Sequence, residues 1–164
     1  MRQLPGGPVT LVFTDIEGST RLLDALGDDY AAALDEHRRR LRTAAASHHG
    51  VEVDTQGDAF FFVFQHAADA LAAAIAAQDA LSAGPIRVRI GMHSGEPIKE
   101  GDKFFGKTLI LAARIASQAA GEEIFVSQLV RDLLESTGEF TFDEGREATL
   151  KGLSGTYRLY GVKW

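Results

Sequence analysis

The stretch that most restricts how this chain can fold is VEVDTQGDAFFFVF, residues 51–64. Apolar residues alternate with polar ones ahead of the triplet Gln-Gly-Asp, and phenylalanines dominate the part that follows it. Alternation with a period of two is typical of a strand, and glycine beside aspartate favours a tight turn. We therefore expect a β-hairpin with QGD at its turn, and the rest of the chain has to be arranged around these two paired strands.

The segments around the hairpin predict an alternation of strands and helices. Short apolar runs mark strands, whereas apolar residues at helical spacing mark helices. The order strand, helices, hairpin, helix, strand suggests an α+β fold with a ferredoxin-like βαββαβ core rather than a doubly wound sheet. The expected elements are a strand over residues 9–14, a helix from Ser19 or Thr20 to Gly27, helices over 28–47 and 66–81, and a strand over 86–92 that leads into a turn at HSGE.

The second half of the chain predicts extra strands and helices added to this core. After a charged loop, KEGDKFFGK, we expect a helix over residues 108–119, a strand at EEIFVS and a short helix over 128–134. Two aromatic-rich segments around a glycine-containing turn close the chain. Because there is no internal repeat or low-complexity segment, residues 1–164 are interpreted as a single domain.

Composition excludes several classes of protein. The chain has 164 residues and a formal charge of -6, which argues against a broad nucleic-acid-binding surface. It contains no cysteine, so thiolate chemistry and disulfides are absent and a reducing compartment is compatible. No stretch approaches the roughly 18 uncharged residues of a membrane helix. We therefore expect a cytoplasmic protein that binds neither membrane nor nucleic acid.

Two aspartates lie where the predicted strands end or turn. Asp15 follows the first strand, and Asp58 lies in the turn of the hairpin. If the two carboxylates meet, they suit Mg²⁺ or Mn²⁺, because these ions favour oxygen ligands. Each residue also has a structural explanation, Asp15 as a helix cap and Asp58 as an ordinary turn residue. The residues alone leave both explanations open.

From Val9 to Trp164 the sequence resembles the catalytic domain of class III nucleotidyl cyclases, the adenylate and guanylate cyclase family. FTDIEGST and DTQGDAFFFVF resemble the two metal-binding motifs of that family, and VRIGMHSGE resembles its central strand. FFGKTLILAARIAS resembles the catalytic helix, and LKGLSGTYRLY the closing hairpin. The resemblance implies the class III cyclase fold and conversion of a nucleoside triphosphate, ATP or GTP, to a 3′,5′-cyclic nucleotide and pyrophosphate in signal transduction.

The resemblance also implies how the triphosphate is bound. Asp15 and Asp58 would hold two divalent ions, Mg²⁺ or Mn²⁺, with help from the carbonyl of Ile16. One ion would activate the ribose 3′-hydroxyl and the other would neutralise the leaving pyrophosphate. Backbone amides at the start of a helix suit phosphate. The residues implied as this phosphate cradle are Glu17, Gly18, Ser19 and Thr20.

Two basic residues match positions that the family uses on the phosphates. Arg114, in LAARIAS, matches an arginine that stabilises charge at the α-phosphate, and Lys151, in LKG, resembles a terminal-phosphate contact. An exposed helix arginine and a solvated lysine are their structural alternatives. Because the family draws each site from two subunits, the resemblance implies a head-to-tail homodimer with two shared active sites.

The positions that read the base depart from the family's adenine pattern. Asp54 stands where that pattern has a lysine, and Lys103 stands where it has an aspartate. A carboxylate suits the donors at guanine N1 and N2, and an ammonium suits the acceptor O6, so the exchange favours guanine. Alternatives remain: Lys103 lies in the flexible-looking stretch EGDKFF, Asp102 is available in its place, and a pyrimidine also satisfies the pair.

Two further departures predict slow turnover. Ile110 occupies the position of the usual catalytic asparagine, and Glu96 replaces an arginine often found after HSG. Losing one positioned donor costs about 2.7 to 4 kcal/mol, or roughly 10² to 10³ in rate. Gln118 and Thr108 are candidates to substitute for the missing donor. The alternative function is a weak or inactive cyclase-like domain that binds nucleotide or dimerises without chemistry.

A competing motif is GDKFFGKT, Gly101 to Thr108, which satisfies the P-loop pattern and precedes a predicted helix. A working P-loop follows a buried parallel strand and wraps its amides around phosphate. EPIKE is a poor buried strand, and two phenylalanines lie inside the loop. A P-loop NTPase is therefore kept as a second alternative, beside the simpler one that Lys107 and Thr108 start an amphipathic helix.

Overall fold

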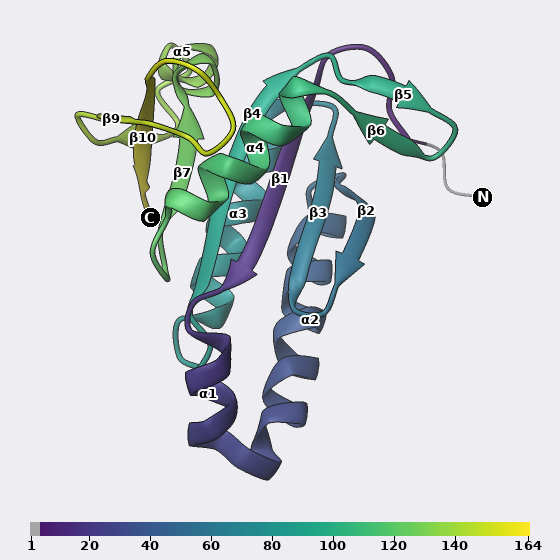
Figure 1. The fold of residues 1–164 in the computed structure, drawn as a ribbon, viewed down its shortest axis with the longest axis vertical. Helices are drawn as coiled ribbons and strands as arrows, with labels where there is room; N and C mark the ends of the chain where they lie inside the picture. The colour runs from purple at the N-terminus through teal and green to yellow at the C-terminus, as the bar shows by residue number, and fades with distance from the viewer. Residues whose placement is uncertain (1–3) are drawn as a thin grey trace.

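The computed structural model describes residues 4–164, which form one large twisted sheet with helices on both faces and a separate small hairpin (Figure 1). The element boundaries follow the sequence patterns closely. In chain order the elements are β1 (Val9–Ile16), α1 (Ser19–Leu26), a 3-10 turn (Gly27–Asp29), α2 (Tyr30–Ser47), β2 (Val51–Gln56), β3 (Ala59–Phe64), α3 (Ala67–Leu81), β4 (Val88–Gly95), β5 (Ile98–Glu100), β6 (Lys103–Phe105), α4 (Lys107–Gln118), β7 (Ile124–Ser127), α5 (Gln128–Glu135), β8 (Thr141–Phe142), β9 (Arg146–Ala148) and β10 (Tyr157–Lys163).

The first four strands form the predicted ferredoxin-like core. They are ordered β2-β3-β1-β4, and each neighbouring pair is antiparallel. The strand β7 then adds parallel to β4, and β10 follows it with β8 and β9 along its other side. The expected α+β class, with extra strands and helices beyond a βαββαβ core, is confirmed.

The phenylalanine run of β3 is buried on both faces of the sheet. Phe60, Phe62 and Phe64 pack into the larger hydrophobic cluster with α2 and α3, which lie behind the sheet in Figure 1. Phe61 and Val63 belong to a second cluster on the opposite face, which includes residues of β6 and α4. Burial on both faces explains why this strand is apolar without alternation.

The strand β2 lies at one edge of the sheet and pairs only with β3 among the described strands. Its pairing with β3 shifts register between Glu52 and Asp54, which is a β-bulge. A bulge bends a strand and turns its side chains. Asp54 is exposed as a result of its place on this edge.

Helix α4 crosses the front of β4 in very close contact with it. A Cβ atom added at Gly91 of β4 would lie 2.2 Å from the amide nitrogen of Ala116. Real side chains do not tolerate such a distance, so glycine is required for the helix to approach. This contact fixes where α4, and with it Arg114, lies over the sheet.

Two sequence expectations need correction in this region. His93, Ser94 and Gly95 were expected in a turn, but they continue β4 and pair with β1. The stretch expected as a charged loop contains β5 and β6, which pair as an antiparallel hairpin outside the main sheet. Strand pairing with β1 continues because the Thr10 and Ser94 hydroxyls are buried and hydrogen-bonded to each other at 2.6 Å.

The P-loop pattern does not form a P-loop. Its central residues make β6, which pairs with β5 rather than with a parallel strand of the main sheet. Phe104 is buried in the second cluster, and only Lys107 and Thr108 enter α4. Amides of a phosphate-binding loop must face the ligand, so this prediction is wrong. Across residues 4–164, no helix combines the length and apolar character needed to cross a membrane.

Candidate active site

The metal-ligand candidate Asp15 lies near the end of β1, where the central strands of the core finish. Its Oδ1 accepts a hydrogen bond of 2.8 Å from the Ile16 amide, and its Oδ2 forms an ion pair with Arg89. The pair follows from strand register, because Asp15 and Arg89 lie directly opposite each other on β1 and β4. Asp15 is therefore part of the strand rather than a cap of α1.

Asp58 lies in the turn between β2 and β3, and its carboxyl group is close enough to Asp15 to be perturbed by it. Partial burial and, next, the negative charge of Asp15 raise the pKa of Asp58, whereas Arg38 and Arg89 act in the opposite direction. The antiparallel pairing of β1 with β3, in which Thr14 lies opposite Phe60, also puts the end of β1 beside the turn that carries Asp58. The folded chain thus brings together the two aspartates that the sequence singled out.

The donor set of this pair suits a hard cation but is incomplete on its own. Among residues 4–164, no group of three or more His, Cys, Asp or Glu side chains gathers as a metal cage. Mg²⁺ commonly takes one or two carboxylates and completes its shell with substrate phosphates and water. A carboxylate pair of this kind, of which Asp15 also lines a cavity, fits that arrangement.

A cavity of about 520 Å³ opens beside Asp15 at the start of α1. Gly18 precedes the helix with a φ of 62°, a left-handed conformation that glycine adopts without strain. No described side chain caps α1, so its first amides remain open to a ligand. The lining residues are Asp15, Ile16, Gly18, Ser19, Thr20, Arg21, Asp24 and Arg89.

Glu17, which was expected in the phosphate cradle, points elsewhere. Its amide donates to the Arg87 carbonyl oxygen at 2.9 Å, and its carboxylate accepts a hydrogen bond from the Gly121 amide. It does not line the cavity. Glu17 instead ties the end of β1 to the segment before β7, while Gly18, Ser19 and Thr20 stay at the cavity wall.

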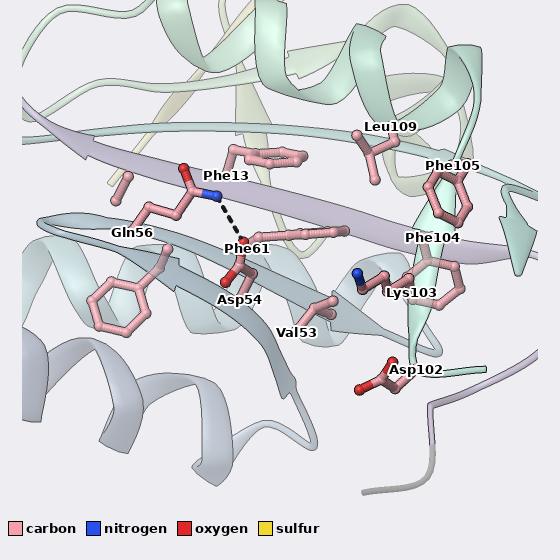
Figure 2. A pocket seen from close by; sticks show the side chains of 12 residues that line it. Phe13, Val53, Asp54, Gln56, Phe61, Asp102, Lys103, Phe104, Phe105 and Leu109 are labelled. Atoms are coloured by element: carbon pink, nitrogen blue, oxygen red, sulfur yellow. Dashed lines mark hydrogen bonds between the residues drawn. The ribbon is translucent and has the colours of Figure 1, made fainter. Parts of the chain in front are cut away.

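A second, larger cavity of about 660 Å³ contains the two residues expected to read the base (Figure 2). Asp54 reaches it from β2 and Lys103 from β6, with Asp102 nearby. Oδ2 of Asp54 accepts a hydrogen bond of 3.1 Å from the side-chain amide of Gln56, which also lines the cavity. The β5–β6 hairpin therefore brings Lys103 to the same space as Asp54.

The walls of this second cavity are aromatic. Phe13 and Phe61 stack with ring centroids 4.4 Å apart and an interplanar angle of 12°, and Phe104 lies 6.4 Å from Phe61. All three line the cavity with Leu109 and Val53. Flat aromatic walls with a carboxylate and an ammonium at the edge suit a planar heterocycle.

Arg114 and Lys151 lie outside both cavities. Arg114 is partly buried on α4, and its Nε is buried without a hydrogen-bond partner among the described residues. Lys151 is exposed in the turn between β9 and β10. Ile110 also lies on α4 with 43% of its surface exposed. None of these three residues lines either cavity.

The functional candidate that sequence reasoning missed is Arg89. It pairs with Asp15, lines the 520 Å³ cavity and adds positive charge beside Asp58. Its signal in the sequence is a charged residue inside the predicted strand over residues 86–92. The pairing of β1 with β4 turns that position toward the aspartates.

The chain has relatives over nearly its whole length. The family model of the adenylate and guanylate cyclase catalytic domain matches residues 2–163. The uncharacterized protein Rv0891c of Mycobacterium tuberculosis is 35% identical over 141 residues, which are 85% of this chain and 48% of that protein. The chain therefore spans about half the length of this curated relative.

Solved structures of low sequence identity share the fold. An adenylate cyclase of Trypanosoma brucei, in its monomeric state, aligns with a TM-score of 0.90 at 22% identity, over 98% of this chain and 90% of that one. The guanylate cyclase domain of RhGC from Catenaria anguillulae, in complex with GTP, aligns with a TM-score of 0.84 at 23% identity, over 96% of each chain.

Proposed function

The chain belongs to the adenylate and guanylate cyclase catalytic domain family, and on this premise we propose that residues 1–164 form one catalytic domain that converts a nucleoside triphosphate to a 3′,5′-cyclic nucleotide and pyrophosphate. The observation that carries the proposal is the placement of Asp15 and the Asp58 turn at the same end of the paired strands β1 and β3, with Asp15 beside the open start of α1. An acidic pair next to free helix amides suits a triphosphate with its cations.

Asp15 and Asp58 are the proposed ligands of two divalent cations, with the Ile16 carbonyl as a further donor. When bound, such cations lower the pKa of the ribose 3′-hydroxyl and neutralise the leaving pyrophosphate. The chain contributes the geometry: β1 fixes Asp15, and the two-residue turn of the hairpin fixes Asp58. Both carboxylates must be ionised to hold a cation.

The phosphates are proposed to lie against Gly18, Ser19 and Thr20, with Arg89 beside them. The amides at the start of α1 carry partial positive charge, and the Arg89 guanidinium adds a full one. In the absence of a ligand Arg89 pairs with Asp15. With Asp15 engaged as a cation ligand, the Arg89 guanidinium would be available to a phosphate oxygen.

A head-to-tail homodimer is proposed because Arg114 and Lys151 lie outside both cavities of their own chain. In a twofold dimer, each subunit presents these residues to the partner's aspartates. Arg114 is only partly buried on α4, which leaves part of its side chain available to a partner subunit. Arg114 would then stabilise charge at the α-phosphate.

Guanine is the proposed base. Asp54 and Lys103 line one aromatic cavity, and Gln56 orients the Asp54 carboxylate. The carboxylate accepts from guanine N1–H and N2–H, and the ammonium donates to O6. Adenine in the same orientation would set its N1 acceptor against the carboxylate and its N6 donors against the ammonium, and mismatched polar groups discriminate strongly.

Turnover of ATP, GTP, CTP and UTP with Mn²⁺ and with Mg²⁺ tests the proposal. Cyclic GMP as the main product, abolished by Asp15→Ala and retained by Lys107→Ala, is the expected outcome. Exclusive use of ATP would refute the guanine proposal while leaving the cyclase proposal intact. The second candidate, a nucleotide-binding domain without turnover, is favoured by Ile110 at the usual asparagine position and predicts binding of GTP without pyrophosphate release.

A further inference from the structure

Helix α2 contacts the turn that carries Asp58. The Nη2 of Arg38 donates a hydrogen bond of 2.9 Å to the carbonyl oxygen of Gly57, the residue before Asp58. Arg38 is only partly exposed, at 31% of its side chain. This hydrogen bond links α2 to the β2–β3 turn at the residue next to Asp58, a proposed metal ligand.

The residue before Arg38 approaches the same turn from inside the protein. His37 is fully buried, and neither of its ring nitrogens has a hydrogen-bond partner among the described residues. The centroid of its ring lies 6.4 Å from that of Phe60, two residues after Asp58. Arg38 therefore contacts the turn directly, and His37 lies beside the start of the strand that follows the turn.

The turn that carries Asp58 is short and has few residues to fix its position. Gly57 has a φ of 63°, and only Gly57 and Asp58 connect β2 to β3. The hydrogen bond from Arg38 to the Gly57 carbonyl oxygen comes from outside the hairpin and restricts how far the turn can move relative to the end of β1.

We propose that His37 and Arg38 are positioning residues that hold the Gly57–Asp58 turn against α2, so that Asp58 stays at the separation from Asp15 that a divalent cation requires. This inference rests on the proposed cyclase function for its consequence. It assigns a role in cation binding to the middle of α2, whose residues do not line the 520 Å³ cavity.

The direction in which Mn²⁺ affinity changes when Arg38 is replaced distinguishes a positioning role from a purely electrostatic one. Arg38 is a positive charge near the site, so removing it would tighten cation binding if charge were its only effect. Loss of positioning has the opposite effect, because partners that orient metal ligands are typically worth about 10–100-fold in metal affinity. Arg38→Met should weaken Mn²⁺ binding by about tenfold, the lower end of that range.

The experiment measures Mn²⁺ affinity of the full chain without nucleotide, by titration calorimetry, for the unmodified protein, Arg38→Met and Arg38→Lys. Arg39→Met is the matched control, because Arg39 lies on the same helix but pairs only with Glu36 in the described structure. We expect the control to bind as the unmodified protein does and Arg38→Lys to recover part of the affinity. Unchanged or tighter binding by Arg38→Met would overturn the inference.

Amide hydrogen exchange of the metal-free proteins tests the support itself. Residues 57–59 should exchange several-fold faster in Arg38→Met and in His37→Phe than in Arg39→Met. Equal exchange in all variants would overturn the inference even if His37→Phe folds poorly, since Arg38→Met gives an independent answer. If the unmodified protein neither binds Mn²⁺ nor forms cyclic nucleotide, the proposed function is wrong. If it binds Mn²⁺ but hydrogen exchange of the turn is the same in all variants, only this inference is wrong.

Discussion

Replacing Gly91 by alanine tests whether the contact between β4 and α4 sets both stability and rate. The added Cβ would lie 2.2 Å from the amide nitrogen and 2.4 Å from the Cα of Ala116. Ordinary van der Waals contact begins at 3.4 Å, so α4 must move by about 1 Å. Backbone cannot rotate aside as a flexible side chain can, and we expect about 3 kcal/mol of destabilisation, the upper end for overpacking.

Urea unfolding followed by circular dichroism measures this loss, and turnover of GTP measures its effect on the site. A displacement of about 1 Å is enough to cost roughly 10²-fold in rate, and α4 carries Arg114. Gly6→Ala is the control, because its Cβ meets no heavy atom within 4 Å. If the free energy of unfolding of Gly91→Ala lies within about 0.5 kcal/mol of that of the control, the close packing deduced for α4 is wrong.

Three other outcomes are expected. The pKa of Asp58 is raised in the metal-free fold, so its ionisation opposes folding as pH rises. Asp58→Asn should therefore stabilise the metal-free protein at pH 7. The same variant should lose the increase in melting temperature that Mn²⁺ causes. Burial lowers the pKa of His93 to about 4, so protonation favours the unfolded chain and the free energy of unfolding should fall as pH drops from 6.5 toward 4. His93→Gln should reduce this pH dependence when unfolding is measured across that range. Asp54→Asn should lower the GTP-to-ATP ratio of kcat/KM by about tenfold or more, whereas an unchanged ratio would remove Asp54 from base selection.

The fold could be predicted from the sequence wherever the hydrophobic periodicity or a turn motif was unambiguous. The run 51–64 predicted the hairpin, and its glycine turn fixed the register. The β5–β6 hairpin was missed because its strands have three residues each and are mostly charged or exposed. Tertiary packing of Phe104, rather than local propensity, holds that hairpin in place.

The site was accessible only in part for a similar reason. Asp15 and Asp58 occupy a strand end and a turn, and both positions follow from local pattern. Arg89 depends on the pairing of β1 with β4, and Arg38 on how α2 lies behind the hairpin, which no local pattern specifies. The amide of Glu17, expected in the phosphate cradle, is instead used by the Arg87 carbonyl oxygen, 70 positions away in the sequence, and no local pattern specifies that contact.

The place of β2 at the edge of the sheet gives Asp54 a consequence for solubility as well as its proposed role in base selection. The neighbouring strand, AFFFVF, has the composition of a segment that assembles into cross-β aggregates when its edge is free. β2 covers that edge, and its bulge and its acidic residues Glu52 and Asp54 discourage another chain from adding to it. Exchanging Asp54 for a neutral residue would therefore remove one of the charges that keep copies of this protein apart. A substitution that changes the proposed base preference at this position would then also raise the tendency to form fibrils.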